Sequence, residues 1–155
     1  MKAYSGSTDC VYPGIGYVKL NAVVVWSASF CSQYPPNRRG VSTLLIDPFS
    51  CTVQQSLQFD THGSANVTKQ LSNYLQLLNL GSIVVAVTGD SAHKNLNNAL
   101  PTLQQLGVEV SDVKFRGSFG FITQKGFPHK TVFRKVLTQA ESSVNPASFN
   151  TTITG

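Results

Sequence analysis

The spacing of apolar residues first predicts a β-hairpin in the middle of the chain. Residues 41–46 are expected to form a strand, and an Asp-Pro pair at 47–48 marks a turn directly after it, because Asp can hydrogen-bond its own backbone and Pro presets φ. Apolar residues then recur at even spacing over 53–59, which gives a returning strand one apolar face.

Two helices follow in the pattern. Apolar residues recur over 65–79 at the spacing of one helix face. Ser64 is the predicted N-cap of this helix, and Gly81 is suited to the turn that follows its C-terminal end. A second helix is expected over 98–106, where Pro101 falls in the first turn and its missing N–H costs no hydrogen bond.

Between the helices, residues 83–87 form an apolar run without polar alternation. Such a run is typical of a central strand that is covered on both faces. We expect Val84, Val85 and Ala86 to lie in this strand beneath the apolar helix faces. The helix residues expected to cover it are Leu71, Leu75, Leu100 and Leu103.

The rest of the chain adds strands and irregular ends. Residues 1–14 are rich in Gly, Ser and Pro, and the tail over 141–155 is polar. Both ends are therefore expected to be irregular, with one compact domain over 15–140. Mixed strands and helices of this kind predict the α+β class. Further strands are expected over 17–26, 113–123 and 131–137.

The composition changes the picture in one respect. Charged residues make up 12% of the 155 residues, about half the usual share, so the polar surface consists mostly of uncharged side chains, as is common in secreted proteins. Apolar runs are too short for a membrane span. Residues 1–7 hold no signal-peptide core, which leaves open a cytosolic chain or a removed signal. Glycosylation acceptors occur at Asn66 and Asn150.

No motif of catalysis or cofactor binding stands out. The three histidines, at 62, 93 and 129, lack metal-ligand spacing. Asp47, Asp60 and Asp90 fall near predicted strand ends, where turn and cap roles are the simplest interpretation. We therefore expect a protein that is not an enzyme and needs no cofactor or metal. The alternative is a carboxylate pair that leaves no motif in the sequence.

The net charge of +5 is concentrated in the C-terminal third of the chain. Such a basic strip attracts phosphate, sulfate or carboxylate groups. A solvated strand face is the simplest interpretation, and an anionic glycan surface is the next. No nucleic-acid signature accompanies the charges, so no nucleic-acid partner is expected. The cations are Lys114, Arg116, Lys125, Lys130, Arg134 and Lys135.

Six short motifs occur in a specific order between residues 39 and 126. In this order the segment resembles the ILEI/PANDER-type domain, also called the GG domain. Proteins that carry this domain include secreted cytokine-like proteins, cell-surface hyaluronan-processing proteins and the stem of the N-acetylglucosaminyltransferase that extends O-mannosyl glycans. The motifs are Arg39-Gly40-Val41, Phe59-Asp60-Thr61, Gly81-Ser82-Ile83-Val84, Leu106-Gly107, Phe115-Arg116-Gly117-Ser118-Phe119 and Lys125-Gly126.

The resemblance implies a fold of two β-sheets with the two main helices packed against them. It also implies a glycan site, because in the transferase stem a loop carboxylate and the motif arginine bind the glycan. The arginine corresponds to Arg116, whereas Gly89 takes the place of the carboxylate, with Asp90 adjacent. Arg116 and Phe119 then offer a planar donor and an aromatic face to a sugar. The expected ligand-binding residues are Asp90, Ser91, His93, Arg116, Gly117, Ser118 and Phe119.

The hypothesis that follows is a secreted, non-catalytic, lectin-like protein that binds glycans or glycoproteins. The alternative is a secreted cytokine-like ligand that recognises a cell-surface receptor, and a homodimer is also considered. Membrane insertion is not expected. An extracellular domain favours one disulfide among Cys10, Cys31 and Cys51 with the pairing left open, over three reduced thiols.

Overall fold

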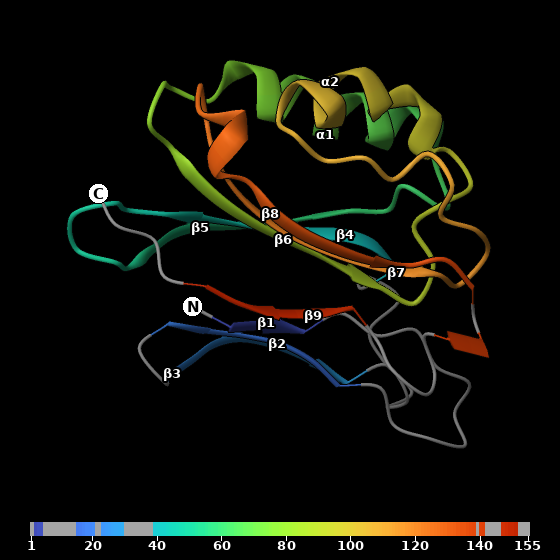
Figure 1. Cartoon of the computed structure of the whole chain (residues 1–155). Helices are drawn as coiled ribbons and strands as arrows, with labels where there is room; N and C mark the ends of the chain where they lie inside the picture. Colours follow the sequence, from blue (N-terminus) through green and yellow to red (C-terminus); the bar gives the residue numbers. More distant parts are fainter. Residues whose placement is uncertain are drawn as a thin grey trace.

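The structure is a computed structural model that describes residues 2–4, 15–20, 23–29, 39–138, 140–141 and 147–151. It is built in three layers, with two helices on top, a five-stranded sheet in the middle and a four-stranded sheet below (Figure 1). The α+β class predicted from the sequence is confirmed. The elements are β1 (Lys2–Tyr4), β2 (Ile15–Leu20), β3 (Val23–Ser29), β4 (Gly40–Ile46), β5 (Val53–Phe59), α1 (Ala65–Leu77), β6 (Ile83–Gly89), η2 (Leu96–Asn98), α2 (Leu100–Gln105), β7 (Ser118–Gln124), η3 (Pro128–Lys130), β8 (Val132–Val136) and β9 (Ser148–Asn150).

The middle sheet is antiparallel throughout and has the strand order β5-β4-β6-β7-β8. The hairpin expected over 41–59 is confirmed as β4 and β5, joined by a turn in which the Asp47 carboxylate accepts hydrogen bonds from the backbone N–H groups of Phe49 and Ser50. The apolar run 83–87 is confirmed as part of the central strand β6, whose residues are all buried.

Both helices lie close to their predicted positions. Ser64 is the N-cap of α1, and its hydroxyl accepts a hydrogen bond from the Val67 N–H at 3.3 Å. The helix ends at Leu77 rather than at residue 79. The second helical segment is divided into η2 and α2, and α2 has Ala99 as its N-cap and Pro101 in its first turn.

The helices cover only one face of the five-stranded sheet (Figure 1). Val84 and Ala86 of β6 belong to the core cluster on this face. Successive side chains of a strand point to opposite faces, and Val85 accordingly belongs to the second cluster, between the two sheets. The prediction that helices cover Val85 is therefore wrong, whereas it holds for Val84 and Ala86. The helix residues of the first cluster are Leu71, Leu75 and Leu103, with Leu100 packed against it.

The four-stranded sheet has the order β3-β2-β1-β9 and packs against the free face of the middle sheet. The single long strand expected over 17–26 is wrong: β2 and β3 are separate strands that pair with each other antiparallel. Asn21, a residue type that favours turns, interrupts this run of strand formers. From the two ends of the chain that were expected to be irregular, β1 and β9 pair with each other.

The structure bears only in part on two further expectations, the strand over 113–123 and the disulfide. Residues 113–117 consist of irregular structure and a turn rather than a strand, so β7 begins at Ser118. Cys51 is an exposed free cysteine, and Cys10 and Cys31 lie outside the described residues, so a bridge between those two stays a prediction. None of the helices in the described segments is long and apolar enough to cross a membrane.

Candidate functional site

Four chain segments meet at one end of the five-stranded sheet. The register pairs Gly40 at the start of β4 with Gly89 at the end of β6. Because neighbouring strands are antiparallel, the segment before β4, the segments after β5 and β6, and the segment before β7 all reach this same end. They carry Arg39, Asp60 to His62, Asp90 to Lys94, and Phe115 with Arg116.

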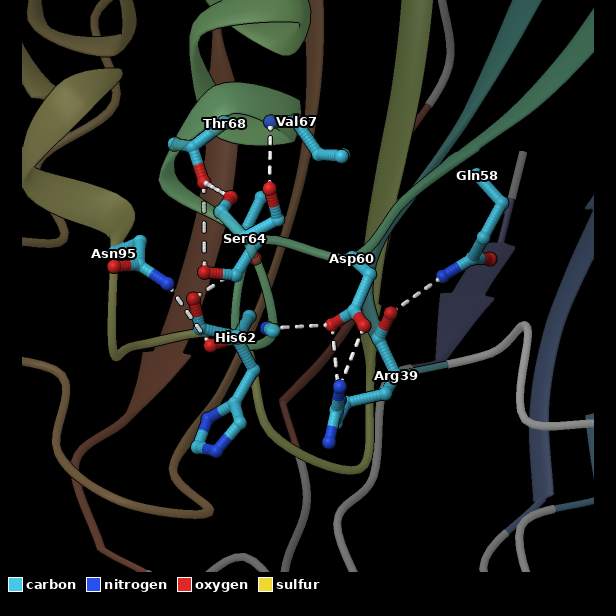
Figure 2. Close-up of polar contacts among 11 residues, drawn as sticks. Arg39, Gln58, Asp60, His62, Ser64, Val67, Thr68 and Asn95 are labelled. Atoms are coloured by element: carbon cyan, nitrogen blue, oxygen red, sulfur yellow. Dashed lines mark hydrogen bonds and ion pairs between the residues drawn. The ribbon is translucent and has the colours of Figure 1, made fainter.

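A forked ion pair joins the first two segments. Arg39 Nε donates to Asp60 Oδ1 at 2.9 Å, and Arg39 Nη2 donates to Asp60 Oδ2 at 2.6 Å (Figure 2). The Gly63 N–H also donates to Asp60 Oδ1, at 2.8 Å. Hydrogen bonds from the Arg39 guanidinium hold the pKa of the Asp60 carboxyl below its usual value. The pair is partly exposed, so its contribution to stability is modest, and its main effect is to fix the geometry.

Hydrogen bonds to backbone carbonyls join the loop after β5 to the loop after β6. The buried Thr61 hydroxyl donates to the Ala92 carbonyl at 2.8 Å. Asn95 contributes twice, because its N–H donates to the Thr61 carbonyl at 3.2 Å and its Nδ2 donates to the His62 carbonyl at 2.9 Å. These bonds hold the His62 backbone while its imidazole points away from α1 (Figure 2).

The third and fourth segments are joined through Asp90 and Arg116. Arg116 Nε lies 3.4 Å from Asp90 Oδ1, and the Arg116 N–H lies 3.5 Å from Ser91 Oγ. Both residues have left-handed backbones, with φ of 47° for Asp90 and 54° for Arg116. Non-glycine residues in this region store strain on the order of 1 kcal/mol each, and such strain is frequent at functional sites.

A half-exposed ring forms the apolar part of the site. Phe115 is 51% exposed. The ring centroids of His62 and His93 lie 6.2 and 5.6 Å from that of Phe115, and the two imidazole centroids lie 5.4 Å apart. The Arg116 guanidinium carbon lies 5.3 Å from the Phe115 centroid. An exposed aromatic face beside planar donors and a carboxylate matches the needs of a sugar ring, which is apolar on its faces and polar at its edges.

Both imidazoles are biased towards the neutral form. Burial lowers the pKa of His62, and the positive charges of Arg39 and Lys94 lower it further. Burial also lowers the pKa of His93, with His62 and Lys94 adding to the effect. Ser91 Oγ lies 3.1 Å from His93 Nδ1. Among the described residues, the buried Nδ1 of His62 has no hydrogen-bond partner.

The structure brings four of the seven expected ligand-binding residues together in one cluster, in which Ser91 is itself buried, and it buries the other three. Asp90, Ser91, His93 and Arg116 lie in the cluster described above. Gly117, Ser118 and Phe119 are buried, and Phe119 is 0% exposed within the core. A fully buried ring offers no face to a ligand, and the exposed aromatic ring of this cluster is Phe115 instead.

The basic strip of the C-terminal third is divided between the two ends of the sheet. Arg116 lies at the site. Lys125 Nζ donates to the Leu75 and Gln76 carbonyls near the end of α1, at 2.9 and 3.1 Å, and thus serves as a C-terminal cap. Lys135 pairs with Asp112 at 2.5 Å. The six cations therefore do not form one continuous anion-binding strip.

Phe115, His62 and Lys94 were not expected at the site. The sequence did contain one signal for Phe115, since it opens the motif that contains Arg116. His62 directly follows the motif Phe59-Asp60-Thr61, but it lies 31 positions before His93, and only the strand topology joins the two. No group of three or more His, Cys, Asp or Glu side chains that could hold a metal occurs in the described part of the chain.

Comparisons with known proteins agree with this architecture. The sequence profile of the family described as Interleukin-like EMT inducer matches residues 39–127, which is more than half of the chain. The zebrafish protein named "Cell surface hyaluronidase" is 34% identical over 91 residues, or 57% of this chain. The human protein named "Cell migration-inducing and hyaluronan-binding protein" is 34% identical over 96 residues, or 61% of this chain. In both cases the match spans 7% of the relative's own length.

Proposed function

Because the chain belongs to the Interleukin-like EMT inducer family, we propose that it is an extracellular, non-catalytic carbohydrate-binding protein. The observation that carries this proposal is the surface formed by Phe115, Arg116 and Asp90, with an exposed ring, a planar donor and a carboxylate within one cluster. The names of the relatives support a polysaccharide ligand, since one is called hyaluronan-binding and another is called a hyaluronidase.

The carboxylates at the site support binding rather than hydrolysis. Glycoside hydrolysis needs two carboxyl groups that are available to the scissile bond. Asp60 is held by the fork of Arg39, and Asp90 lies in an ion pair with Arg116. Arg116 and Asp90 are also presented by constrained loops, which reduces the entropy lost when a ligand binds.

Phe115→Ala is expected to weaken glycan binding by at least about tenfold, or roughly 1.4 kcal/mol, because the sugar loses its aromatic face. The melting temperature should hardly change, since the ring is 51% exposed. Titration calorimetry with a glycan identified on an array measures the first quantity, and a thermal melt measures the second.

Phe127→Ala is the matched control, because Phe127 is a half-exposed ring with a cation, Lys130, 4.9 Å from its centroid. Phe127 follows β7 and lies at the opposite end of the sheet. Equal losses of binding in the two variants would move the site away from Phe115.

Arg116→Lys keeps the charge and removes the planar fork of donors. If the guanidinium holds the sugar, affinity should fall by at least about tenfold, or roughly 1.4 kcal/mol. The melting temperature should change little, because partly exposed ion pairs contribute about 0–1 kcal/mol. Arg134→Lys, on the exposed position of β8, is the control. Unchanged glycan affinity in Arg116→Lys would remove this residue from the binding site.

A cytokine-like ligand that recognises a receptor protein is the second candidate. Four exposed apolar side chains belong to segments that adjoin the end of the sheet opposite to the site, where Ile46 and Ile83 pair. Single exposed apolar side chains are ordinary, whereas a contiguous patch of them marks a contact surface. A glycan array distinguishes the two candidates, since the absence of binding to any glycan on it favours recognition of a receptor protein. The side chains are Phe49, Leu77, Leu80 and Phe127, exposed by 95, 84, 82 and 39%.

A further inference from the structure

The two imidazoles of the site form a pair whose charge can change near neutral pH. His62 and His93 have ring centroids 5.4 Å apart, and both rings contact Phe115. Each side chain is half-buried. Nδ1 of His93 lies 3.1 Å from Ser91 Oγ, and Nδ1 of His62 is buried, which leaves Nε2 of each ring as the nitrogen not engaged in these contacts.

The charges around this pair leave an excess of positive charge. Arg39 before β4 pairs with Asp60 after β5, and Arg116 before β7 pairs with Asp90 after β6. Lys94 is the fifth charge near the pair, and it has no ion-pair partner within the described segments. Among the residues that the structure describes, three cations thus lie near two carboxylates even while both imidazoles are neutral. Protonation of either imidazole in the free protein adds to this excess, which opposes it.

We propose that His62 and His93 bind the acidic group of a saccharide and take up a proton as it binds. This inference rests on the carbohydrate-binding function proposed above. An anion at the imidazole pair offsets the surplus of positive charge and favours the imidazolium form. The proton comes from solvent, the imidazole nitrogen accepts it, and the resulting cation donates a charge-assisted hydrogen bond to the ligand carboxylate or sulfate.

The consequence is an affinity that rises as the pH falls. The pKa values of His62 and His93 are lowered in the free protein, and the bound anion raises them. In the window between the free and the bound pKa, one proton changes the affinity by up to about tenfold per pH unit. The carboxylate of a uronate stays ionised through this window, so the slope belongs to the protein.

In the free protein, the pH dependence of stability has the opposite sign to the pH dependence of affinity. Because the folded pKa values of both histidines lie below their value in the unfolded chain, the unfolded chain binds more protons near pH 6.5. The melting temperature of the free protein should therefore fall as the pH drops below about 6.5. An acidic saccharide should reverse this fall.

The test uses a hyaluronan hexasaccharide and the same oligosaccharide with its carboxyl groups reduced to hydroxymethyl groups. Titration calorimetry at pH 6.5 in two buffers of different ionisation enthalpy should give different apparent heats for the acidic probe only. Its affinity should rise by about tenfold from pH 7.5 to 5.5, which corresponds to an average uptake of about half a proton over these two pH units.

Single and double His62→Gln and His93→Gln variants should flatten this profile and the pH dependence of the free protein's melting temperature. His129→Gln is the control, because His129 lies against Phe127 on the opposite end of the sheet. Thermal melts at pH 7.5 show that each variant is folded.

Three results would overturn the inference. Binding of the acidic probe with equal heats in both buffers leaves the carbohydrate-binding function standing and removes the proton uptake. An equal pH slope for the reduced probe assigns the slope to something other than the acidic group. Binding of neither probe, together with silence across a glycan array, removes both the inference and the function on which it rests.

Discussion

Val85→Asp should leave no soluble, native-like protein. Val85 is 0% exposed and lies on the central strand β6, in the cluster between the two sheets. Burying a carboxylate without a partner costs several kcal/mol, and the loss of the valine adds a packing cost. Domains of this size are stable by only about 5–15 kcal/mol, so the variant should unfold or precipitate.

Val23→Asp separates burial from charge. Val23 carries the same side chain at the start of β3, where it is 64% exposed, so its carboxylate stays in water and the melting temperature should change little. Soluble expression and a thermal melt compare the two variants. A cooperative melt of Val85→Asp close to that of the wild type would contradict the placement of Val85 between the sheets.

The local spacing of apolar residues along the sequence predicted three of the elements. The hairpin of β4 and β5, the capped helix α1 and the buried run of β6 each carry their pattern within a few consecutive residues, and all three are present. Pairing between distant segments leaves no such pattern. The contact of β1 with β9 joins the two ends of the chain, and the sequence held no periodic signal for it.

The sequence also does not determine which layer, the helices or a second sheet, covers each face of β6. The alternation of a strand places Val85 opposite to Val84 and Ala86, but it does not say whether a helix or a sheet covers each face. The sequence predicted that helix faces cover Val84, Val85 and Ala86, whereas a second sheet covers Val85. An uninterrupted apolar run indicates that a strand is buried on both faces, but it does not indicate which element packs against each face.

The candidate site includes residues that a sequence motif indicates and residues that only the strand topology brings together. The motif around Arg116 identifies the segment, but residues 113–117 consist of irregular structure and a turn, so strand alternation does not apply to them and the sequence indicates Phe119 rather than Phe115. His62 meets His93 only because β5 and β6 both end at the same edge of the antiparallel sheet.

Gly40 lies where β4 closely approaches the segment that carries Asp60, and Gly40→Ala should lower both stability and glycan binding. Its φ is +99°, and a Cβ at this position would overlap the Phe59 carbonyl oxygen and lie 2.7 Å from the Thr61 nitrogen. These are backbone atoms of the segment that carries Asp60, so they move only if β5 shifts away from β4. We expect a loss of about 2–4 kcal/mol in the free energy of unfolding.

Gly81→Ala supplies the comparison that assigns this loss. Gly81 also has a positive φ, +85°, but nothing lies within 4 Å of a Cβ built there. It should therefore lose only about 1 kcal/mol, which is the cost of the left-handed backbone. Denaturant unfolding of both variants measures the difference. The folded fraction of Gly40→Ala should also bind glycan more weakly, because a shifted Asp60 no longer meets both donors of Arg39. Equal losses of stability in the two variants would mean that the backbone dihedral alone requires glycine at position 40, and that the close approach of β4 to the Asp60 segment does not.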